Sequence, residues 1–144
     1  MRVLIAAIGK AKASPERQLY QDYIKRLKWK VECHEFAAAG KEREGELLLS
    51  ACAGYDKLIA LDESGKPLSS REFSENLSQW QQQGNSSFAF IIGGADGLSS
   101  SVLKKSHLAW SLGRVTWPHM LVRSLLAEQL YRAYSLLNNH PYHR

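Results

Sequence analysis

The chain has 144 residues, of which 44% are hydrophobic and 23% are charged, and its formal net charge is +5. These proportions are those of an ordinary soluble globular protein, and the length favours one domain over residues 1–144. The two cysteines, Cys33 and Cys52, lie far apart and form no CxxC pair, which argues against a disulfide framework or a zinc site.

The apolar run nearest the start, Val3 to Ile8, is too short for a signal-peptide core or a membrane span. It leads into Gly9-Lys10, which does not look like a cleavage site. We therefore expect a cytoplasmic protein with no membrane partner.

Basic charge collects at the C-terminal end. Residues 104–144 carry six basic and one acidic side chain, together with four of the five histidines. A basic segment rich in His, Tyr and Arg favours a polyanionic partner, for which RNA is the natural candidate. A mildly basic surface with no partner is the alternative interpretation.

The first half of the chain predicts two strands and two helices. Arg2 to Gly9 is typical of a buried strand, and Ser14-Pro15 starts a helix that ends near Lys28. Val31 to Ala38 predicts a second strand. The charged loop 39–44 is either a solvated face or a mobile loop over a substrate site, and a helix follows at 47–53.

The second half continues the alternation of strands and helices. Ser69 or Ser70 caps a helix that ends at Gly84-Asn85, with Glu72 in its first turn. The remaining elements are strands at 57–61, 88–92 and 108–112, a short helix at 99–106 and a long final helix at 120–137. This order predicts an α/β fold with a mainly parallel sheet and helices on both faces.

Three loops follow the apolar strands that end at Leu61, Ile92 and Leu112. Neighbouring parallel strands would place these loops along one edge of the sheet. Glycines at 93, 94, 97 and 113 would let a ligand such as adenine approach the backbone, or would only make tight turns. A phosphate-binding loop is disfavoured, because the spacing is not G-x-G-x-x-G and Asp96 would repel phosphate.

Polar candidates for chemistry lie on and before the final helix. His119 is the only histidine next to the proposed ligand loops, so it is a candidate for catalysis. The alternative is that it only forms a hydrogen bond with the backbone at the start of the helix. Arg123 and Arg132 either act on a substrate or lie on a solvated or ion-paired face, with Glu128 as a ready partner for Arg132. No metal-ligating spacing stands out, so no metal is expected.

The polar tail 138–144 ends in Tyr142, His143 and Arg144. Chain ends are usually frayed, so the residues alone favour disorder. The tail also offers an aromatic ring, imidazoles and a guanidinium, which could hold an RNA loop with a splayed-out base.

The stretches IIGGADGLS, WSLGRVTWPHMLVRSLLAEQLYRA and NHPYHR resemble SPOUT-superfamily RNA methyltransferases, and the resemblance extends over nearly the whole chain. It is most specific to the bacterial enzymes that methylate N3 of a pseudouridine in 23S ribosomal RNA. It implies a C-terminal trefoil knot that forms the pocket for the cofactor S-adenosyl-L-methionine. The cofactor-binding residues that it implies are Leu61, Gly93, Leu112, Gly113, Arg114, Val115, Thr116 and Trp117.

The resemblance also implies a homodimer in which each site is completed by the partner chain, with the assembled ribosome as substrate. The implied catalytic residues, on the RNA side, are His119, Arg123, Arg132, Tyr142, His143 and Arg144. Two alternatives stay open: a SPOUT enzyme acting on another RNA such as tRNA, and a non-catalytic RNA-binding module.

Overall fold

The computed structural model describes residues 1–144, which form two compact units, each built from three segments of the chain. The sheet unit comprises residues 1–10, 29–67 and 86–116. The helical unit comprises residues 11–28, 68–85 and 117–144.

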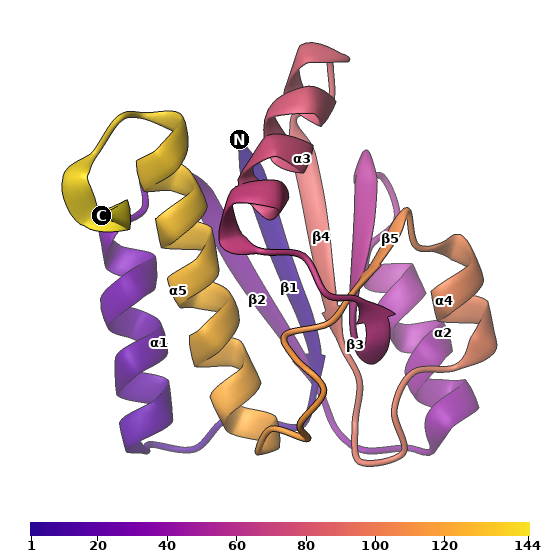
Figure 1. Cartoon of the computed structure of the whole chain (residues 1–144). Helices are drawn as coiled ribbons and strands as arrows, with labels where there is room; N and C mark the ends of the chain where they lie inside the picture. Colours follow the sequence, from indigo (N-terminus) through magenta and orange to yellow (C-terminus); the bar gives the residue numbers. More distant parts are fainter. The chain divides into compact units, whose positions relative to one another are not determined.

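The sheet unit contains a five-stranded sheet in which every pairing is parallel, in the order β2-β1-β4-β3-β5 (Figure 1). The strands are β1 (Arg2–Ile8), β2 (Lys30–Phe36), β3 (Lys57–Lys66), β4 (Ser87–Ile92) and β5 (Leu108–Trp110). The predicted parallel α/β fold is confirmed.

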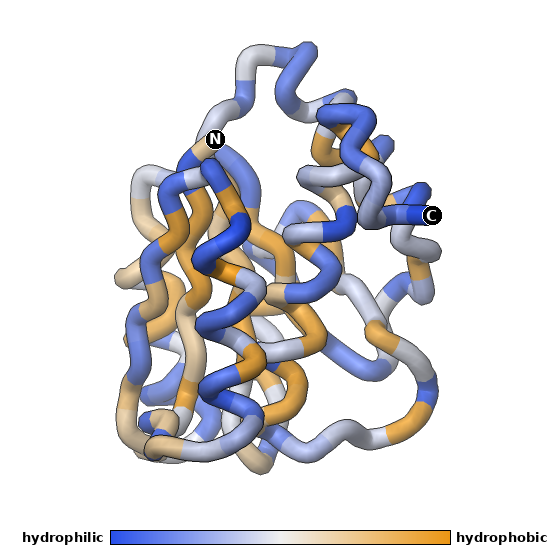
Figure 2. The backbone as a smooth tube through the Cα atoms, turned by 90° about the vertical axis from the view of Figure 1, so that its left-hand side faces the viewer, coloured by the Kyte–Doolittle hydropathy of each residue, from blue (hydrophilic) through white to orange (hydrophobic).

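The central strands β1 and β4 are buried on both faces, from Val3 to Ile8 and from Ser87 to Ile92. Strands buried in this way have near-continuous apolar sequences, which is why both runs stand out in the amino-acid sequence. Orange, hydrophobic stretches mark such runs along the tube in Figure 2, whereas the labelled C-terminus is blue.

Strand β3 is longer than the predicted strand 57–61. After an irregularity between Leu61 and Lys66, the chain returns to the sheet and Lys66 pairs with Trp110 of β5. A Cβ atom at Gly65 would lie 2.5 Å from the Ala109 carbonyl oxygen, so only glycine fits this close approach. The polar residues before Gly65 made this segment look like a loop.

Helices α2 (Lys41–Ala51) and α4 (Ser100–Lys105) belong to the sheet unit and pack against each other. Their apolar residues, with those of β1, β3 and β4, form a buried core that includes Leu4, Ile91, Leu48, Cys52 and Val102. Helix α2 begins at Lys41, before the predicted residue 47, and follows Gly40 at φ +85°. The prediction placed the start too late because the first turn of the helix is polar.

The helical unit contains α1 (Pro15–Arg26), α3 (Ser70–Gln82), α5 (His119–Leu137) and the short 3₁₀ helix η1 (Pro141–His143). Helix α5 packs against both α1 and α3. The predicted caps are confirmed. Ser14 accepts from the Arg17 N–H at 3.2 Å, and Ser69 forms a reciprocal capping box with Glu72.

None of the helices combines the length and the hydrophobicity that a membrane-spanning helix needs. The trefoil knot and the one-domain organisation stay predictions.

The two thiols should differ sharply in reactivity. Cys33 is exposed, whereas Cys52 lies in the core, where burial raises its thiol pKa to about 12. Because the thiolate is the reactive form, we expect a disulfide reagent at pH 8 to modify one thiol per native chain. Spectrophotometric thiol counting would test this, and Cys33→Ser should remove the fast reaction. Fast modification of Cys33→Ser without denaturant would contradict the packing described for Cys52.

Candidate functional site

The register of the sheet places the irregularity of β3 that begins after Leu61 at the level of the ends of β4 and β5. Leu61 pairs with Ile92 on one side and with Trp110 on the other. Leu61 therefore lies beside the strand end that precedes Gly93 and beside the strand end that precedes Leu112. The structure thus brings the loops of the predicted cofactor residues to one edge of the sheet unit, as expected from parallel strands.

The loop after β4 is a tight turn in which the Gly97 N–H donates to the Gly94 carbonyl at 3.0 Å. A Cβ atom at Gly93 would lie 2.9 Å from both the Gly97 oxygen and a Leu98 methyl carbon. Gly93 is therefore required for the closure of the loop itself. Gly97 has φ +78° and open space where a Cβ would be, so its glycine serves the backbone conformation.

The loop after β5 is tied back to the end of β3. Buried Ser111 donates from its backbone N–H to the Lys66 carbonyl at 3.0 Å, and its hydroxyl donates to the Gly113 carbonyl at 2.8 Å. Farther along, the Thr116 hydroxyl donates to the Glu63 carboxylate at 3.0 Å. Sequence reasoning missed Ser111 and Glu63; a serine between two apolar residues at a strand end was the only available signal.

The side chains of the predicted cofactor run are mostly solvent-facing. Arg114, Val115 and Thr116 of the sheet unit are exposed, with 59% of Val115 accessible. In the helical unit, Trp117 is 38% exposed. Gly113 adopts φ +121° with no atom near its missing Cβ. A ligand at this edge would therefore meet backbone N–H and C=O groups, which suit the donor and acceptor pattern of adenine.

The same edge of the sheet unit is acidic, since Asp62 and Glu63 of β3 follow Leu61 and Asp96 lies in the glycine turn. Carboxylates disfavour a phosphate ligand and favour a cationic one. No group of three His, Cys, Asp or Glu side chains is placed to hold a metal ion.

The second group of candidate residues lies on α5 in the helical unit. His119 is the first residue of this helix and is partly buried. Arg123 is only 4% exposed, so the solvated-face interpretation is wrong for this residue. Arg132 is paired with Glu128, as considered from the sequence, with its Nε 2.9 Å from a carboxylate oxygen. The hydrogen bond to Glu128 raises the pKa of Arg132.

The tail folds back onto the helical unit, so the expectation of a frayed end is wrong. Asn139 at φ 54° reverses the chain, and the His140 N–H donates to the Ser135 carbonyl at 2.8 Å. The Tyr142 ring then packs on Tyr131, with 4.6 Å between ring centroids. The tail is thereby held by α5 from within the same chain.

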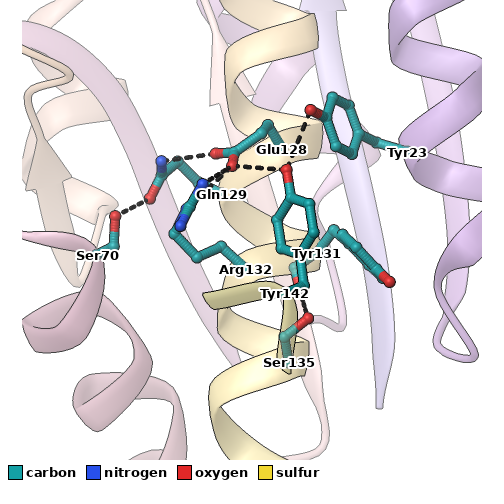
Figure 3. A network of polar contacts seen from close by, with 8 residues as sticks. All are labelled: Tyr23, Ser70, Glu128, Gln129, Tyr131, Arg132, Ser135 and Tyr142. Carbon is teal, nitrogen blue, oxygen red and sulfur yellow. Dashed lines mark hydrogen bonds and ion pairs between the residues drawn. The ribbon is translucent and has the colours of Figure 1, made fainter. Parts of the chain in front are cut away.

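Tyr142 joins a polar network centred on Glu128 (Figure 3). Its hydroxyl donates to Glu128 at 3.0 Å and lies 3.1 Å from the Tyr23 hydroxyl of α1. The Arg132 guanidinium stands 5.1 Å from the centroid of the Tyr142 ring. Sequence reasoning found the Glu128–Arg132 spacing but missed Tyr23 and Tyr131, because contacts between distant segments leave no local signal.

Burial, followed by the hydrogen bonds to Tyr23 and Glu128, raises the pKa of Tyr142. The phenol is therefore neutral near pH 7 and can donate a hydrogen bond, but it does not act as a base. The neighbouring tail residues differ from it. The His143 Nδ1 atom is buried without a hydrogen-bond partner, and Arg144 is exposed.

A family model described as "Predicted SPOUT methyltransferase" matches residues 1–143. The chain is 49% identical to "Ribosomal RNA large subunit methyltransferase H" of Paramagnetospirillum magneticum and 45% identical to the protein of that name from Rhodospirillum centenum. Each alignment covers 100% of this chain and 99% of the relative.

Among solved structures, a probable methylase family protein from Haemophilus influenzae is similar in fold, with a TM-score of 0.59 at 12% identity. The match covers 97% of this chain and 67% of that protein.

The tail should contribute to the stability of the chain, contrary to what disorder would imply. Tyr142→Ala removes a packed ring and should cost about 2 kcal/mol, whereas Tyr142→Phe keeps the ring and should cost about 1 kcal/mol. Urea unfolding followed by circular dichroism would measure both. Arg144→Ala, an exposed change two residues away, is the control and should be nearly neutral. Equal stability of Tyr142→Ala and wild type would contradict the docked tail.

Proposed function

We propose that this chain, which belongs to the SPOUT methyltransferase family, is an RNA methyltransferase. The proposed reaction transfers a methyl group from S-adenosyl-L-methionine to N3 of a pseudouridine in large-subunit ribosomal RNA. The observation that carries this proposal is the meeting of the irregular segment of β3 with the loops after β4 and β5, in a chain matched end to end by relatives named for that RNA.

The residues present fit the cofactor. The glycine turn and the loop 111–116 have open space where Cβ atoms of Gly97 and Gly113 would lie, so a purine could approach the backbone there. The nearby carboxylates of Asp62, Glu63 and Asp96 suit a ligand with a positive charge. The cofactor, when bound, supplies an electrophilic methyl group on a sulfonium, so the chain needs neither a metal nor a covalent nucleophile.

The acceptor nitrogen sets the task of the chain's own residues. N3 of the uracil ring carries a proton at neutral pH, so this proton must leave and the resulting anion must be stabilised. We assign this work to His119, Arg123 and Arg132, with Tyr142 donating a hydrogen bond and His143 and Arg144 binding RNA. Arg132 already holds its guanidinium over the Tyr142 ring, which orients both groups.

The helical unit is the basic part of the chain, with nine basic and five acidic side chains. We propose that it meets the RNA, and that the assembled ribosome in the cytoplasm supplies much of the docking surface. We also propose that the protein works as a homodimer whose partner chain completes each site.

Binding of the methyl donor is the first test. Isothermal titration calorimetry should show S-adenosyl-L-methionine binding, with no binding of NAD or ATP. Gly93→Ala should weaken binding about tenfold or more, because a Cβ forces the turn apart by overpacking. The matched control is Gly84→Ala, which has open space and a positive φ away from these loops. Binding of NAD or ATP in place of the methyl donor would refute the cofactor assignment.

Methyl transfer to the ribosome is the second test. With tritiated donor, ribosomes should be labelled and tRNA should not, and mass mapping should place the methyl group on N3 of a pseudouridine in 23S rRNA. Labelled tRNA would point to another SPOUT specificity, and RNA binding without transfer would point to a binding module.

The catalytic cations can be tested in the same assay. Loss of one charge-stabilising donor typically slows a reaction about 100-fold, which we expect for Arg132→Ala and for His119→Ala. Arg26→Ala is the control, since Arg26 stacks on Tyr23 and Tyr131 of the same cluster but has no assigned role. An equal loss for Arg26→Ala would mean that Arg132 contributes only general attraction for RNA.

A further inference from the structure

Glu44 is a buried acid in the first turn of α2, within the charged stretch that was expected to be a solvated face or a mobile loop. That interpretation holds for Lys41, Glu42 and Arg43, which are exposed, but it fails for Glu44, which is only 6% exposed. The carboxylate accepts a hydrogen bond from the Ala39 N–H at 3.1 Å.

The carboxylate of Glu44 lies directly against the glycine turn after β4. A Cβ atom at Gly94 would be 3.1 Å from one carboxylate oxygen and 3.3 Å from the other, and 3.1 Å from a methyl carbon of Ile8. The Gly94 backbone therefore packs against the side chains of Glu44 and Ile8.

The sheet register explains why one side chain can reach both loops. Ile8 at the end of β1 pairs with Phe36 of β2, and Ala7 pairs with Ile92 of β4. The segment 37–40 that follows β2 and the turn that follows β4 consequently leave the same edge of the sheet. Glu44 bonds the first through Ala39 and touches the second at Gly94.

A carboxylate is a costly choice for a position that only needs filling. Removing a carboxylate from water is unfavourable, and an apolar side chain of similar size would fill the same space without that penalty. The buried acid is explained if Glu44 fixes the backbone conformation of the turn at Gly94, and if that conformation is needed for ligand binding.

We propose that Glu44 is a positioning residue for methyl-donor binding: it braces Gly94 and so holds the 93–97 turn in the shape that receives the cofactor. This inference rests on the proposed function. Glu44 acts through the Gly94 backbone, by keeping the loop pre-organised so that binding does not have to order it.

The first test compares three variants by calorimetry with S-adenosyl-L-methionine and by thermal unfolding. Glu44→Ala should weaken binding of the methyl donor about tenfold. This is the size of effect expected when a residue in direct contact with the binding loop is removed. Glu44→Gln keeps the shape and the acceptor for the Ala39 N–H, so it should restore binding to near the wild-type value. Glu42→Ala, an exposed acid in the same turn of α2, is the matched control and should bind normally.

Gly94→Ala probes the contact from the other side. Its added methyl group should press on Glu44 and weaken binding. In the double variant with Glu44→Ala, the added methyl group has room because the Glu44 side chain is gone. The loss of affinity for the methyl donor should therefore be smaller than the product of the losses in the two single variants. A strictly multiplicative loss would show that the two positions do not act through one contact, and would overturn the proposal.

Hydrogen exchange measured on the free protein keeps this inference separate from the proposed function. Glu44→Ala should speed exchange in residues 93–98, where the Gly97 N–H bonds the Gly94 carbonyl, while Glu42→Ala should not. Unchanged exchange and unchanged affinity, with only a lower melting temperature, would reduce Glu44 to a stabiliser of α2. If the wild type binds no methyl donor but exchange changes as expected, the proposed function fails while the bracing stands.

Discussion

The parallel pairing of β3 with both of its neighbours is the constraint on which the candidate site depends. Since Leu61 pairs with Ile92 and with Trp110, the irregular segment of β3 and the turns after β4 and β5 lie at one level, where they compete for the same space. The consequence is visible at Gly93 and Gly65, where a Cβ would lie 2.9 Å and 2.5 Å from backbone oxygens of Gly97 and Ala109. Crowded turns with no side chains leave backbone groups as the natural ligand contacts.

The helical unit depends in a similar way on one carboxylate. Glu128 binds Arg132 within α5, accepts from Tyr142 of the tail, and accepts from Gln129 at 2.8 Å. Gln129 in turn accepts from Ser70 of α3, and Tyr142 reaches Tyr23 of α1. Every element of the unit is thus joined through this acid. Because the Glu128–Arg132 pair is partly exposed, an RNA phosphate could compete for the guanidinium without breaking the fold.

Local chemistry was predictable from the sequence, and contacts between distant segments were not. Ser14 and Ser69 predicted the starts of their helices correctly, because a helix cap involves only three or four neighbouring residues. The central strands of the sheet were equally clear, because burial on both faces makes them continuous apolar runs. Glu44 was expected in a solvated face or a mobile loop, and Tyr142 in a frayed tail. Only the fold shows that Glu44 packs against Gly94 and that the Tyr142 ring packs on Tyr131.

The distribution of charge separates the proposed enzyme from a module that only binds RNA. The helical unit carries nine basic side chains against five acidic ones, whereas the sheet unit is nearly balanced, with ten against nine. Within the sheet unit, Asp62 and Glu63 of β3 and Asp96 of the glycine turn lie at the edge where the predicted cofactor loops meet. A binding module would gain nothing from acids there, because they repel RNA. A methyltransferase has two substrates of opposite charge, a cationic methyl donor and a polyanion, and this chain carries a matching charge for each in a different unit.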